Sequence, residues 1–344
     1  MEKLKNPNSG LGQFCINIGE QFQSLQNKNV QLDFYLPAFQ KNVFGDQFNY
    51  IKQIVLHKFL PVDSSKYDVW HCLQQDSYYL PNNKNTKLIL TIHDLNFLEK
   101  YKGSKQKRKL NSLQKRVNRA SVITVISKFT EAIVRENLQL NNIPVHVIYN
   151  GNSLKIVENC IAPDFVPAHS EAEYLFAIGI ISAKKNFHTL LPLLQKNKNL
   201  HLIIAGNNNS EYAKQMGATA EKMGVAKQLH TPGTIDDAEK YWLYQNCKAF
   251  VFPSLSEGFG LPVVEAMSLG KPVFLSKLSS LPEIGGKEAF YWNNFEPQHM
   301  IDMFEKGIKD FTADKEKRNR SINWAKQFSW ENAAKAYINL YENL

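Results

Sequence analysis

The clearest chemical signal in the sequence is the segment SLSEGFGLPVVEAMSLG, residues 254–270. Two closely spaced glycines permit a tight turn after an apolar run, and Pro262 suits the first turn of a helix. The N–H groups at the start of such a helix carry partial positive charge and favour a phosphate. Glu257 and Glu265 flank this turn. A carboxylate beside a bound phosphate is unfavourable unless it has another role, and accepting hydrogen bonds from sugar hydroxyls is one such role.

The rest of the sequence predicts a doubly wound α/β framework around this segment. Short apolar runs alternate with helical patterns, and the runs are apolar throughout, as in parallel strands buried on both faces. Repeated units of a strand followed by a helix favour parallel sheets covered by helices. The expected strands are residues 30–35, 67–72, 88–92, 122–126, 145–149, 174–178, 200–205, 249–252, 272–275 and 289–292. The expected helices include residues 105–119, 128–137, 210–223 and 262–269.

Two domains are expected, because the strand and helix pattern restarts near residue 170 and the chain has 344 residues. Residues 150–170 contain Asn-Gly and two prolines without clear periodicity, and we interpret them as the linker region. The predicted N-terminal domain is residues 1–165 and the predicted C-terminal domain is residues 166–328. Residues 329–344 form a last helix with Ser329 as its N-cap.

The start of the sequence is unusual for such a domain. The turn Asn-Ser-Gly-Leu-Gly at residues 8–12 is followed at once by a helical pattern. In a doubly wound domain this turn follows the first strand, yet residues 1–9 contain no apolar run. Either the domain begins irregularly, with its first strand missing, or the true start lies upstream. In the second case, the genomic sequence encodes an apolar strand in frame with Met1.

Composition excludes several other classes of protein. The chain is 43% hydrophobic and 21% charged, which excludes a wholly disordered or fibrous chain. No run approaches 18 apolar residues and no apolar leader is present, so we expect neither a membrane-spanning helix nor a secretory signal. The four cysteines lack Cys-x-x-Cys spacing and predict neither a disulfide framework nor a zinc site. We therefore expect a cytoplasmic protein, either free or peripheral on the inner face of the membrane.

The positive charge of the chain is concentrated in one segment. The formal net charge is +9, and residues 100–119 contain nine Lys and Arg and no acidic residue. Three interpretations are open: a solvated helix face, a surface that meets anionic lipid or a lipid-linked acceptor, and a nucleic-acid surface. Leu110, Leu113 and Val117 form an apolar stripe, which a helix packed on a core also has. Tyr101 is the only aromatic residue in the segment, so nucleic acid is not expected.

An ordered set of motifs resembles the retaining, nucleotide-sugar-dependent glycosyltransferases of family 4, part of glycosyltransferase group 1. The resemblance covers nearly the whole chain and implies the GT-B fold. That fold has two facing Rossmann-like domains with the donor in the cleft between them, and a C-terminal helix that crosses back to the N-terminal domain. The motifs are GLG at 10–12, TIHDL at 91–95, ITVISKFT at 123–130, IYNG at 148–151, GIISAKKNFHTLL at 179–191, IIAG at 203–206, PGTIDD at 232–237, EGFGLPVVEAMSLGKPV at 257–273 and FSW at 328–330.

For the C-terminal domain, the resemblance implies a donor site. Glu257 would bind hydroxyls of the donor sugar, Glu265 would bind the ribose, and Lys185 would neutralise the departing diphosphate. Main-chain groups at 234 and 235 would contact the base, and backbone N–H groups at 259–261 would hold the sugar or diphosphate. The further donor-binding positions are Lys184, Asn186, Thr234, Ile235, Phe259, Gly260 and Leu261.

For the N-terminal domain, the resemblance implies the remaining site residues. His93 would lie near the sugar and the diphosphate, with a catalytic role, and Asp94 would lie near the acceptor. Gly10 and Gly12 would let this domain approach the phosphate or the acceptor closely.

One departure from the family pattern bears on the donor. Many relatives have Arg one residue after the glycine that matches Gly179, and this chain has Ile180 there. The charge on the leaving group must then be met by Lys185, with Lys184. A mannosyltransferase-like branch shares this feature, which favours GDP-mannose over a UDP-sugar.

Neither a metal nor a separate cofactor is expected. A lysine and a helix N-terminus can stabilise the departing diphosphate, and Asp236-Asp237 lacks the spacing of an Asp-x-Asp metal motif.

The resemblance therefore implies a hexosyltransferase that acts with retention, and we expect it to act without metal. The acceptor would be a glycan or a lipid-linked sugar in cell-surface polysaccharide synthesis, such as that of lipopolysaccharide. Two alternatives remain open. The first is a GT-B nucleotide-sugar 2-epimerase, which would release free sugar. The second is a basic nucleic-acid-binding protein without enzymatic activity, which would bind DNA in a salt-dependent way.

Overall fold

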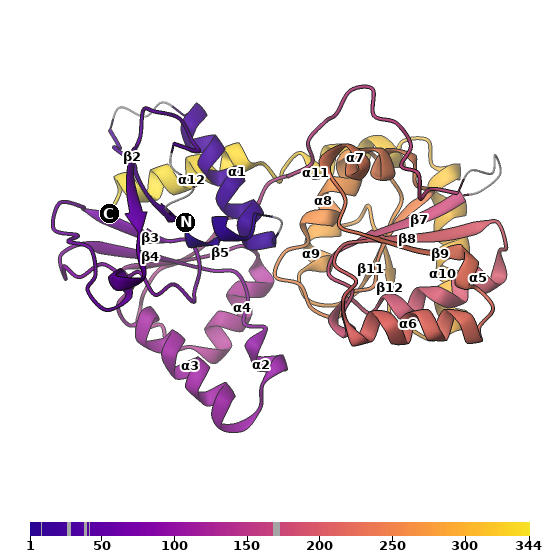
Figure 1. Cartoon of the computed structure of the whole chain (residues 1–344), viewed down its shortest axis with the longest axis horizontal. Helices are drawn as coiled ribbons and strands as arrows, with labels where there is room; N and C mark the ends of the chain where they lie inside the picture. The colour runs from indigo at the N-terminus through magenta and orange to yellow at the C-terminus, as the bar shows by residue number, and fades with distance from the viewer. Residues whose placement is uncertain (8, 26–28, 38–39, 41, 168–172) are drawn as a thin grey trace. The chain divides into compact units, whose positions relative to one another are not determined.

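The computed structural model divides into two compact units (Figure 1). One unit comprises Met1–Gly151 with Phe328–Leu344, and the other comprises Asn152–Gln327. The first division falls at residues 151/152, fourteen residues before the predicted boundary at 165/166. Part of the predicted linker, residues 168–170, lies outside the described residues. The structure describes residues 1–7, 9–25, 29–37, 40, 42–167 and 173–344.

Gly151 explains why the first unit ends where it does. A Cβ atom at this position would lie 2.1 Å from the backbone nitrogen of Trp330, so the glycine packs directly against the start of the last helix. That helix, α12 (Trp330–Glu342), is capped by Ser329 and packs against α1 (Gly10–Ser24). The C-terminal segment therefore belongs to the same unit as the N-terminus.

The first unit contains two separate parallel sheets. The four-stranded sheet has the order β3-β4-β5-β6, and β1 pairs with β2 in a second sheet. These strands are β1 (Asp33–Pro37), β2 (Asn49–Gln53), β3 (Val69–Cys72), β4 (Lys87–Ile92), β5 (Val122–Val125) and β6 (Val145–Val147). The remaining helices of this unit are α2 (Phe97–Lys100), α3 (Gly103–Val117) and α4 (Lys128–Asn137).

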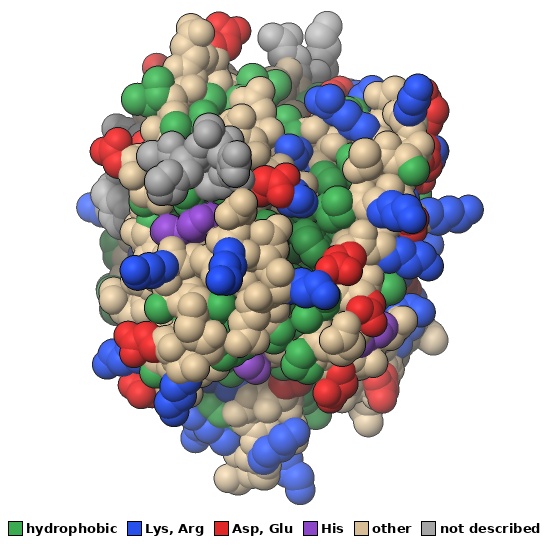
Figure 2. Space-filling model, turned by 90° about the vertical axis from the view of Figure 1, so that its right-hand side faces the viewer, with side chains coloured by type: hydrophobic (Ala, Val, Ile, Leu, Met, Phe, Trp, Pro, Cys, Tyr) green, Lys and Arg blue, Asp and Glu red, His purple; other side chains and the backbone are tan. Residues whose placement is uncertain are grey.

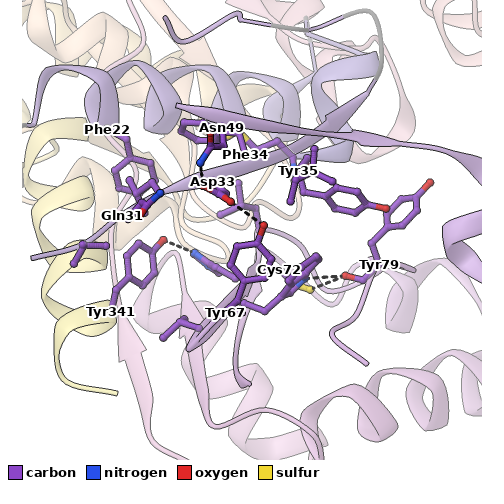
Figure 3. Close-up of a pocket in the computed structure, with 18 of the residues that line it drawn as sticks. Phe22, Gln31, Asp33, Phe34, Tyr35, Asn49, Tyr67, Cys72, Tyr79 and Tyr341 are labelled. Atoms are coloured by element: carbon purple, nitrogen blue, oxygen red, sulfur yellow. Dashed lines mark hydrogen bonds between the residues drawn. The ribbon is translucent and has the colours of Figure 1, made fainter. Parts of the chain in front are cut away.

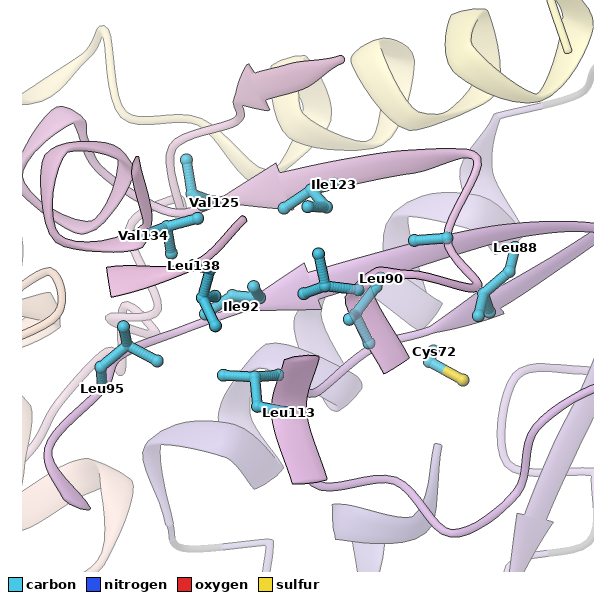
Figure 4. Packing of buried hydrophobic residues seen from close by; sticks show 12 residues of the cluster. Cys72, Leu88, Leu90, Ile92, Leu95, Leu113, Ile123, Val125, Val134 and Leu138 are labelled. Atoms are coloured by element: carbon cyan, nitrogen blue, oxygen red, sulfur yellow. The ribbon is translucent and has the colours of Figure 1, made fainter. Parts of the chain in front are cut away.

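The core of this unit lies between the four-stranded sheet and its covering helices (Figure 4). Leu90 and Ile92 of β4 are fully buried, as expected for a parallel strand covered on both faces. Leu113 and Val117 of α3 belong to the same cluster, and Leu110 packs against it. The apolar stripe of the basic segment therefore faces the core of its own unit.

The second unit contains one six-stranded parallel sheet of order β12-β11-β10-β7-β8-β9. Its strands are β7 (Glu173–Ile178), β8 (Leu200–Ala205), β9 (Leu229–Gly233), β10 (Ala249–Phe252), β11 (Val273–Ser276) and β12 (Phe290–Trp292). Its helices are α5 (Leu191–Lys196), α6 (Glu211–Lys222), α7 (Asp237–Asn246), α8 (Leu261–Ser268), α9 (Leu281–Gly285), α10 (Pro297–Ala313) and α11 (Lys317–Ala325).

The strand order of this sheet reverses between β7 and β10. From β7 the chain adds β8 and β9 on one side, and from β10 it adds β11 and β12 on the other. The loops after β7 and β10 consequently lead in opposite directions. In doubly wound sheets, ligands bind outside the carboxyl ends of the strands at such a switch point.

The described residues before α1 form a turn of 3-10 helix, Glu2–Lys5, with no strand among them. Ser9 caps α1, because its Oγ accepts a hydrogen bond from the Gly12 nitrogen at 3.0 Å.

Candidate functional site

An ion pair lies at the switch point of the second unit. Lys185 follows β7, Glu257 follows β10, and the Lys185 Nζ donates to Glu257 Oε1 at 2.7 Å. The two side chains are only 16% and 13% exposed. The same ammonium lies 4.4 Å from the centre of the Phe252 ring. The structure thus brings together two of the predicted donor-site residues, 72 positions apart in the sequence.

The loops after β7, β10 and β11 are joined around this pair. The Leu255 nitrogen donates to the Lys184 carbonyl at 2.8 Å, which ties the β10 loop to the β7 loop. The Ser254 hydroxyl donates to Glu257, and the Glu257 nitrogen donates to the Ser279 hydroxyl at 2.9 Å. Glu257 is therefore held from both its side chain and its backbone.

The charge of Glu257 is maintained by its surroundings. Burial raises the pKa of a carboxyl group, but the positive charges of Lys185 and Lys184 and the hydrogen bonds from Lys185 and Ser254 outweigh it. The net effect lowers the pKa of Glu257 below its ordinary value of 4.5. At neutral pH the site holds a carboxylate paired with an ammonium.

This lowered pKa predicts a stability change in acid. Ionised Glu257 stabilises the fold above pH 4.5, and this contribution is lost as the pH falls through the folded-state pKa. We expect Glu257→Gln to flatten the loss of unfolding free energy below pH 4.5, because the amide does not titrate. Urea unfolding of both proteins across the acid range measures this, and identical pH profiles would contradict it.

The turn after Glu257 leads into α8 with the geometry that the sequence predicts. Gly260 is the N-cap residue and has φ +110°, a conformation that favours glycine, and a proline lies in the first turn. The buried Ser280 hydroxyl donates to the carbonyls of Glu257 at 3.0 Å and Phe259 at 2.8 Å. The start of α8, including Leu261, is thereby fixed beside the ion pair.

Glu265 has different partners from Glu257. It lies on α8 and is 5% exposed. Its Oε2 accepts a hydrogen bond from the Tyr244 hydroxyl at 2.8 Å, and its Oε1 lies 3.4 Å from the Lys240 Nζ. Burial and the nearby carboxylate raise the pKa of Tyr244, so this hydroxyl remains a donor. Glu265 is therefore oriented by α7, and its predicted role at the ribose stays a prediction.

Three glycines form the carboxyl edge of the sheet beside the site. Gly179 and Gly206 directly follow β7 and β8, Gly233 is the last residue of β9, and all three have positive φ. The Gly206 nitrogen donates to the Gly233 carbonyl at 2.6 Å. A Cβ at 206 would lie 2.2 Å from the Gly179 carbonyl oxygen, so these backbones approach closely. Thr234 and Ile235 follow this edge directly.

The loop after β7 also places the other predicted donor residues. Lys184 is half-buried beside Lys185, and Ile180 is 63% exposed. Asn186 has φ +58° and is 5% exposed, yet its Nδ2 has no hydrogen-bond partner among the described residues. A buried amide donor without a partner is costly, and a bound ligand would satisfy it.

In the first unit, His93 makes contacts within its own unit. Its Nε2 donates to the Leu73 carbonyl at 2.8 Å, and its ring meets the Phe14 ring edge-on at 4.7 Å. Burial lowers the pKa of His93 to about 4, so the imidazole is neutral at pH 7. Asp94 Oδ1 accepts from the Asn96 nitrogen at 3.0 Å. These contacts fix both side chains, and their predicted roles stay predictions.

Gly10 and Gly12, the two glycines of the first turn, differ in how closely other residues pack around them. A Cβ at Gly12 would lie 2.1 Å from the Asn6 carbonyl oxygen, so this glycine is needed for packing within its own unit. A Cβ at Gly10 would meet nothing within 4 Å among the described residues. Of the two, Gly10 alone leaves open space at the start of α1.

Family models match both parts of the chain. The model described as "Glycosyltransferase Family 4" matches residues 36–155, and "Glycosyl transferases group 1" matches residues 163–328. The chain belongs to the group 1 glycosyltransferases.

Among curated relatives of this glycosyltransferase, two come from Escherichia coli. "Serotype-specific mannosyltransferase WbdA" is 28% identical over 279 residues, 75% of this chain and 34% of that protein. "O-antigen chain mannosyltransferase B" is 27% identical over 292 residues, 78% of this chain and 73% of that protein. The chain spans about a third or less of the length of the WbdA proteins it matches.

Solved structures support the GT-B fold for this glycosyltransferase, with two Rossmann-like domains. Sucrose-phosphate synthase from Thermosynechococcus elongatus matches with a TM-score of 0.73 and 17% identity, over 97% of this chain and 93% of that one. Anabaena Alr3699/HepE in complex with UDP and glucose matches with the same score and identity, over 98% and 97%. No helix among the described residues has both the length and the apolar character needed to span a membrane.

Several residues that position the site of this glycosyltransferase were not predicted from the sequence. Ser254 hydrogen-bonds Glu257, and Tyr244 hydrogen-bonds Glu265. Gly206 shapes the sheet edge. The available signal was a small residue within two positions of the end of a buried strand, as at 206 and 254. Nothing local marks Tyr244 as a partner of a residue 21 positions away.

Proposed function

We propose that this glycosyltransferase transfers a hexose from a nucleoside diphosphate sugar to a glycan or lipid-linked acceptor, in cell-surface polysaccharide synthesis such as that of lipopolysaccharide. The observation that carries the proposal is the largely buried Lys185–Glu257 ion pair at the switch point of the sheet. An ammonium and a carboxylate held in this place match the two ends of the donor, a diphosphate and a sugar bearing hydroxyl groups.

The proposed donor complex rearranges this pair. The diphosphate attracts the Lys185 ammonium, while Glu257 accepts hydrogen bonds from sugar hydroxyls. The first N–H groups of α8 face the same charge. The Asn186 Nδ2, which has no hydrogen-bond partner within the described part of the chain, supplies a further donor. Because these groups are in place once the donor is bound, little further reorganisation is needed when charge develops on the leaving group.

In the proposed reaction, the bond between the anomeric carbon and the diphosphate oxygen breaks, and that oxygen keeps the electron pair. The acceptor hydroxyl attacks the anomeric carbon on the same face, which retains the configuration. Its proton passes to the departing diphosphate. Lys185 and the start of α8 stabilise the charge on the leaving group without a metal.

Mannose is the sugar we favour. Relatives of this chain are named as mannosyltransferases, including WbdA and O-antigen chain mannosyltransferase B. The exposed Ile180, in place of an arginine, fits the mannosyltransferase-like pattern. The transferase names also favour transfer over the epimerase alternative and over a nucleic-acid-binding protein. Product analysis distinguishes a transferase from an epimerase, because an epimerase releases free sugar.

A thermal-shift panel of nucleotide sugars, run in EDTA, tests the donor and the metal independence together. A ligand that binds only the native state raises Tm. We expect GDP-mannose to raise Tm more than UDP-glucose or GDP alone, and sugar transfer to persist in the same buffer. Absence of a shift with every nucleotide sugar would contradict the proposed donor site. Full loss of transfer in EDTA, restored by Mg²⁺, would contradict the metal-free mechanism.

We propose in addition that α3 contacts anionic lipid head groups electrostatically, without inserting. The apolar stripe of α3 packs into the core, whereas Lys107, Arg108 and Lys115 lie together on an exposed face of the helix. On the face seen in Figure 2, by contrast, basic and acidic side chains are interspersed.

Vesicle binding tests this second proposal. We expect the protein to co-sediment with phosphatidylserine vesicles and high salt to abolish this binding. The variant K107E/R108E should bind more weakly, whereas K198E, at an exposed lysine of the other unit, is the control and should bind like the wild type. Equal binding to neutral vesicles would contradict this.

A further inference from the structure

The segment that follows β2, residues 54–60, carries a group of exposed apolar side chains, and we call it the apolar turn. It contains a turn of 3-10 helix over Val55–Lys58. Single exposed apolar residues are ordinary on a protein surface, whereas several together mark a surface that meets a partner or a membrane. Five of the seven residues are large and apolar, with exposed fractions from 40% to 78%: Ile54, Val55, Leu56, Phe59 and Leu60.

Contacts within the first unit hold the apolar turn in shape. The Phe59 nitrogen donates to the Leu56 carbonyl at 2.9 Å. His57 is half-buried, and its Nδ1 lies 2.7 Å from the hydroxyl oxygen of Tyr35 in β1. The Tyr35 ring in turn lies beside the Tyr79 ring, with 5.3 Å between the ring centres (Figure 3). The turn is therefore anchored through its backbone and its histidine, which leaves its apolar side chains at the surface.

A line of contacts joins the apolar turn to the basic helix α3. The Lys58 Nζ lies 5.1 Å from the centre of the Tyr78 ring, and the Arg116 guanidinium carbon lies 6.0 Å from the same centre. Arg116 also donates to the Ser77 carbonyl at 3.0 Å and to the Ser112 carbonyl at 2.9 Å. Because Arg116 and Ser112 belong to α3, the apolar turn lies beside the helix proposed above to contact lipid.

The charge around the apolar turn suits an anionic lipid surface. No acidic residue occurs between Asp46 and Asp63 in the sequence, whereas Lys52 and Lys58 are both exposed. Tyr78, which joins the turn to α3, is also exposed. Apolar and aromatic side chains bordered by basic ones are the pattern found at the boundary between lipid head groups and acyl chains.

A second copy of the chain suits this surface less well than a bilayer does. A specific protein interface takes about 20–30 residues on each side. The apolar turn and Tyr78 together supply six large exposed side chains. A bilayer surface requires no matching shape, because each apolar side chain can be buried separately among the acyl chains.

We propose that the apolar turn inserts its side chains into the interfacial region of a bilayer that contains anionic phospholipid. This inference rests on the membrane contact proposed for α3. Phe59 lies among the upper parts of the acyl chains, and lipid head groups lie against Lys58 and Arg116. Because a few apolar side chains alone bind a bilayer only marginally, the insertion adds to the electrostatic attraction of α3 and is lost with it at high salt.

Fluorescence quenching by lipids with brominated acyl chains tests the insertion directly. Phe59→Trp places a reporter at the most exposed residue of the apolar turn, and Ile156→Trp, equally exposed in the other unit, is the matched control. With phosphatidylserine vesicles that contain brominated phosphatidylcholine, Phe59→Trp should lose more emission than the wild type, and its spectrum should shift to the blue. Ile156→Trp should be quenched no more than the wild type.

The affinity for the same vesicles provides a second readout. F59S/L60S should weaken co-sedimentation by at least about tenfold, whereas Ile156→Ser should leave it unchanged. Vesicle binding by Phe59→Trp without added quenching would overturn the insertion and leave the α3 contact in place. Absence of vesicle binding by the wild type would overturn both proposals. A wild-type dimer in solution that F59S/L60S dissociates would instead assign the apolar turn to a second copy of the chain.

Discussion

Lys185→Ala is expected to lower kcat/KM for sugar transfer by at least about tenfold, or roughly 1.4 kcal/mol of transition-state stabilisation. The ammonium is held 2.7 Å from Glu257 and is 16% exposed, so its charge is fixed at one position of the site. Because its proposed partner in the reaction is the departing diphosphate, the loss should fall on kcat as well as on KM. Steady-state kinetics with GDP-mannose measure both.

The matched controls separate loss of the charge from damage to the fold. Lys198→Ala removes an exposed lysine of the same unit and should leave the rate unchanged. Lys185→Ala leaves the Glu257 carboxylate largely buried and unpaired, which lowers stability. The double variant K185M/E257Q removes both charges and should recover stability while remaining inactive. A folded Lys185→Ala protein with the wild-type rate would refute the proposed role of Lys185.

Gly206→Ala is expected to destabilise the second unit by about 2 kcal/mol or more. The added Cβ would lie 2.2 Å from the carbonyl oxygen of Gly179, and Gly206 has φ +130°, which L side chains rarely adopt. The three atoms nearest to the added Cβ are all backbone atoms of Gly179, so the clash cannot be relieved by movement of a flexible side chain. The strands β7 and β8 must separate at their carboxyl ends, next to Lys185.

Gly217→Ala is the matched control for this substitution. Gly217 lies in α6, where an added Cβ would have none of the described residues' other atoms within 4 Å, apart from the backbone of its own helix and its two chain neighbours. Alanine is the better helix former, so we expect a gain of about 0.5–1 kcal/mol. Urea unfolding of both variants gives the two free energies. A Gly206→Ala protein as stable as the wild type would show that the sheet edge is less tightly packed than the structure indicates.

The sequence predicted the strands that lie in apolar runs and missed two strands, β2 and β9, that have no such run. The runs at 200–205 and 249–252 match β8 and β10. By contrast, β9 reads LHTPG, with every residue only partly buried, at the outer edge of its sheet. The partly exposed NYIKQ of β2 likewise shows no apolar run. Edge strands bury less surface and therefore carry a weaker hydrophobic pattern.

The sequence named Glu257 and Lys185 as candidate donor-site residues but did not predict that they pair. Local pattern placed Glu257 before a helix and Lys185 after a strand. Their contact depends on β7 lying beside β10, and strand order is a non-local property that periodicity does not encode. The same limit applies to α3, whose stripe at 110, 113 and 117 was compatible with a core or a membrane. Contacts with β-strand residues decided in favour of the core.

The carboxylate of Glu257 serves as a resident counter-ion in the unliganded protein. An incoming anion must displace it from Lys185. An anion without a sugar has no sugar hydroxyl groups that could donate hydrogen bonds to the freed carboxylate. On the proposed function, inorganic phosphate and pyrophosphate are therefore poor competitors at this position. A complete donor restores a partner to both charges at once, so the ion pair discriminates in favour of substrate before any chemistry begins.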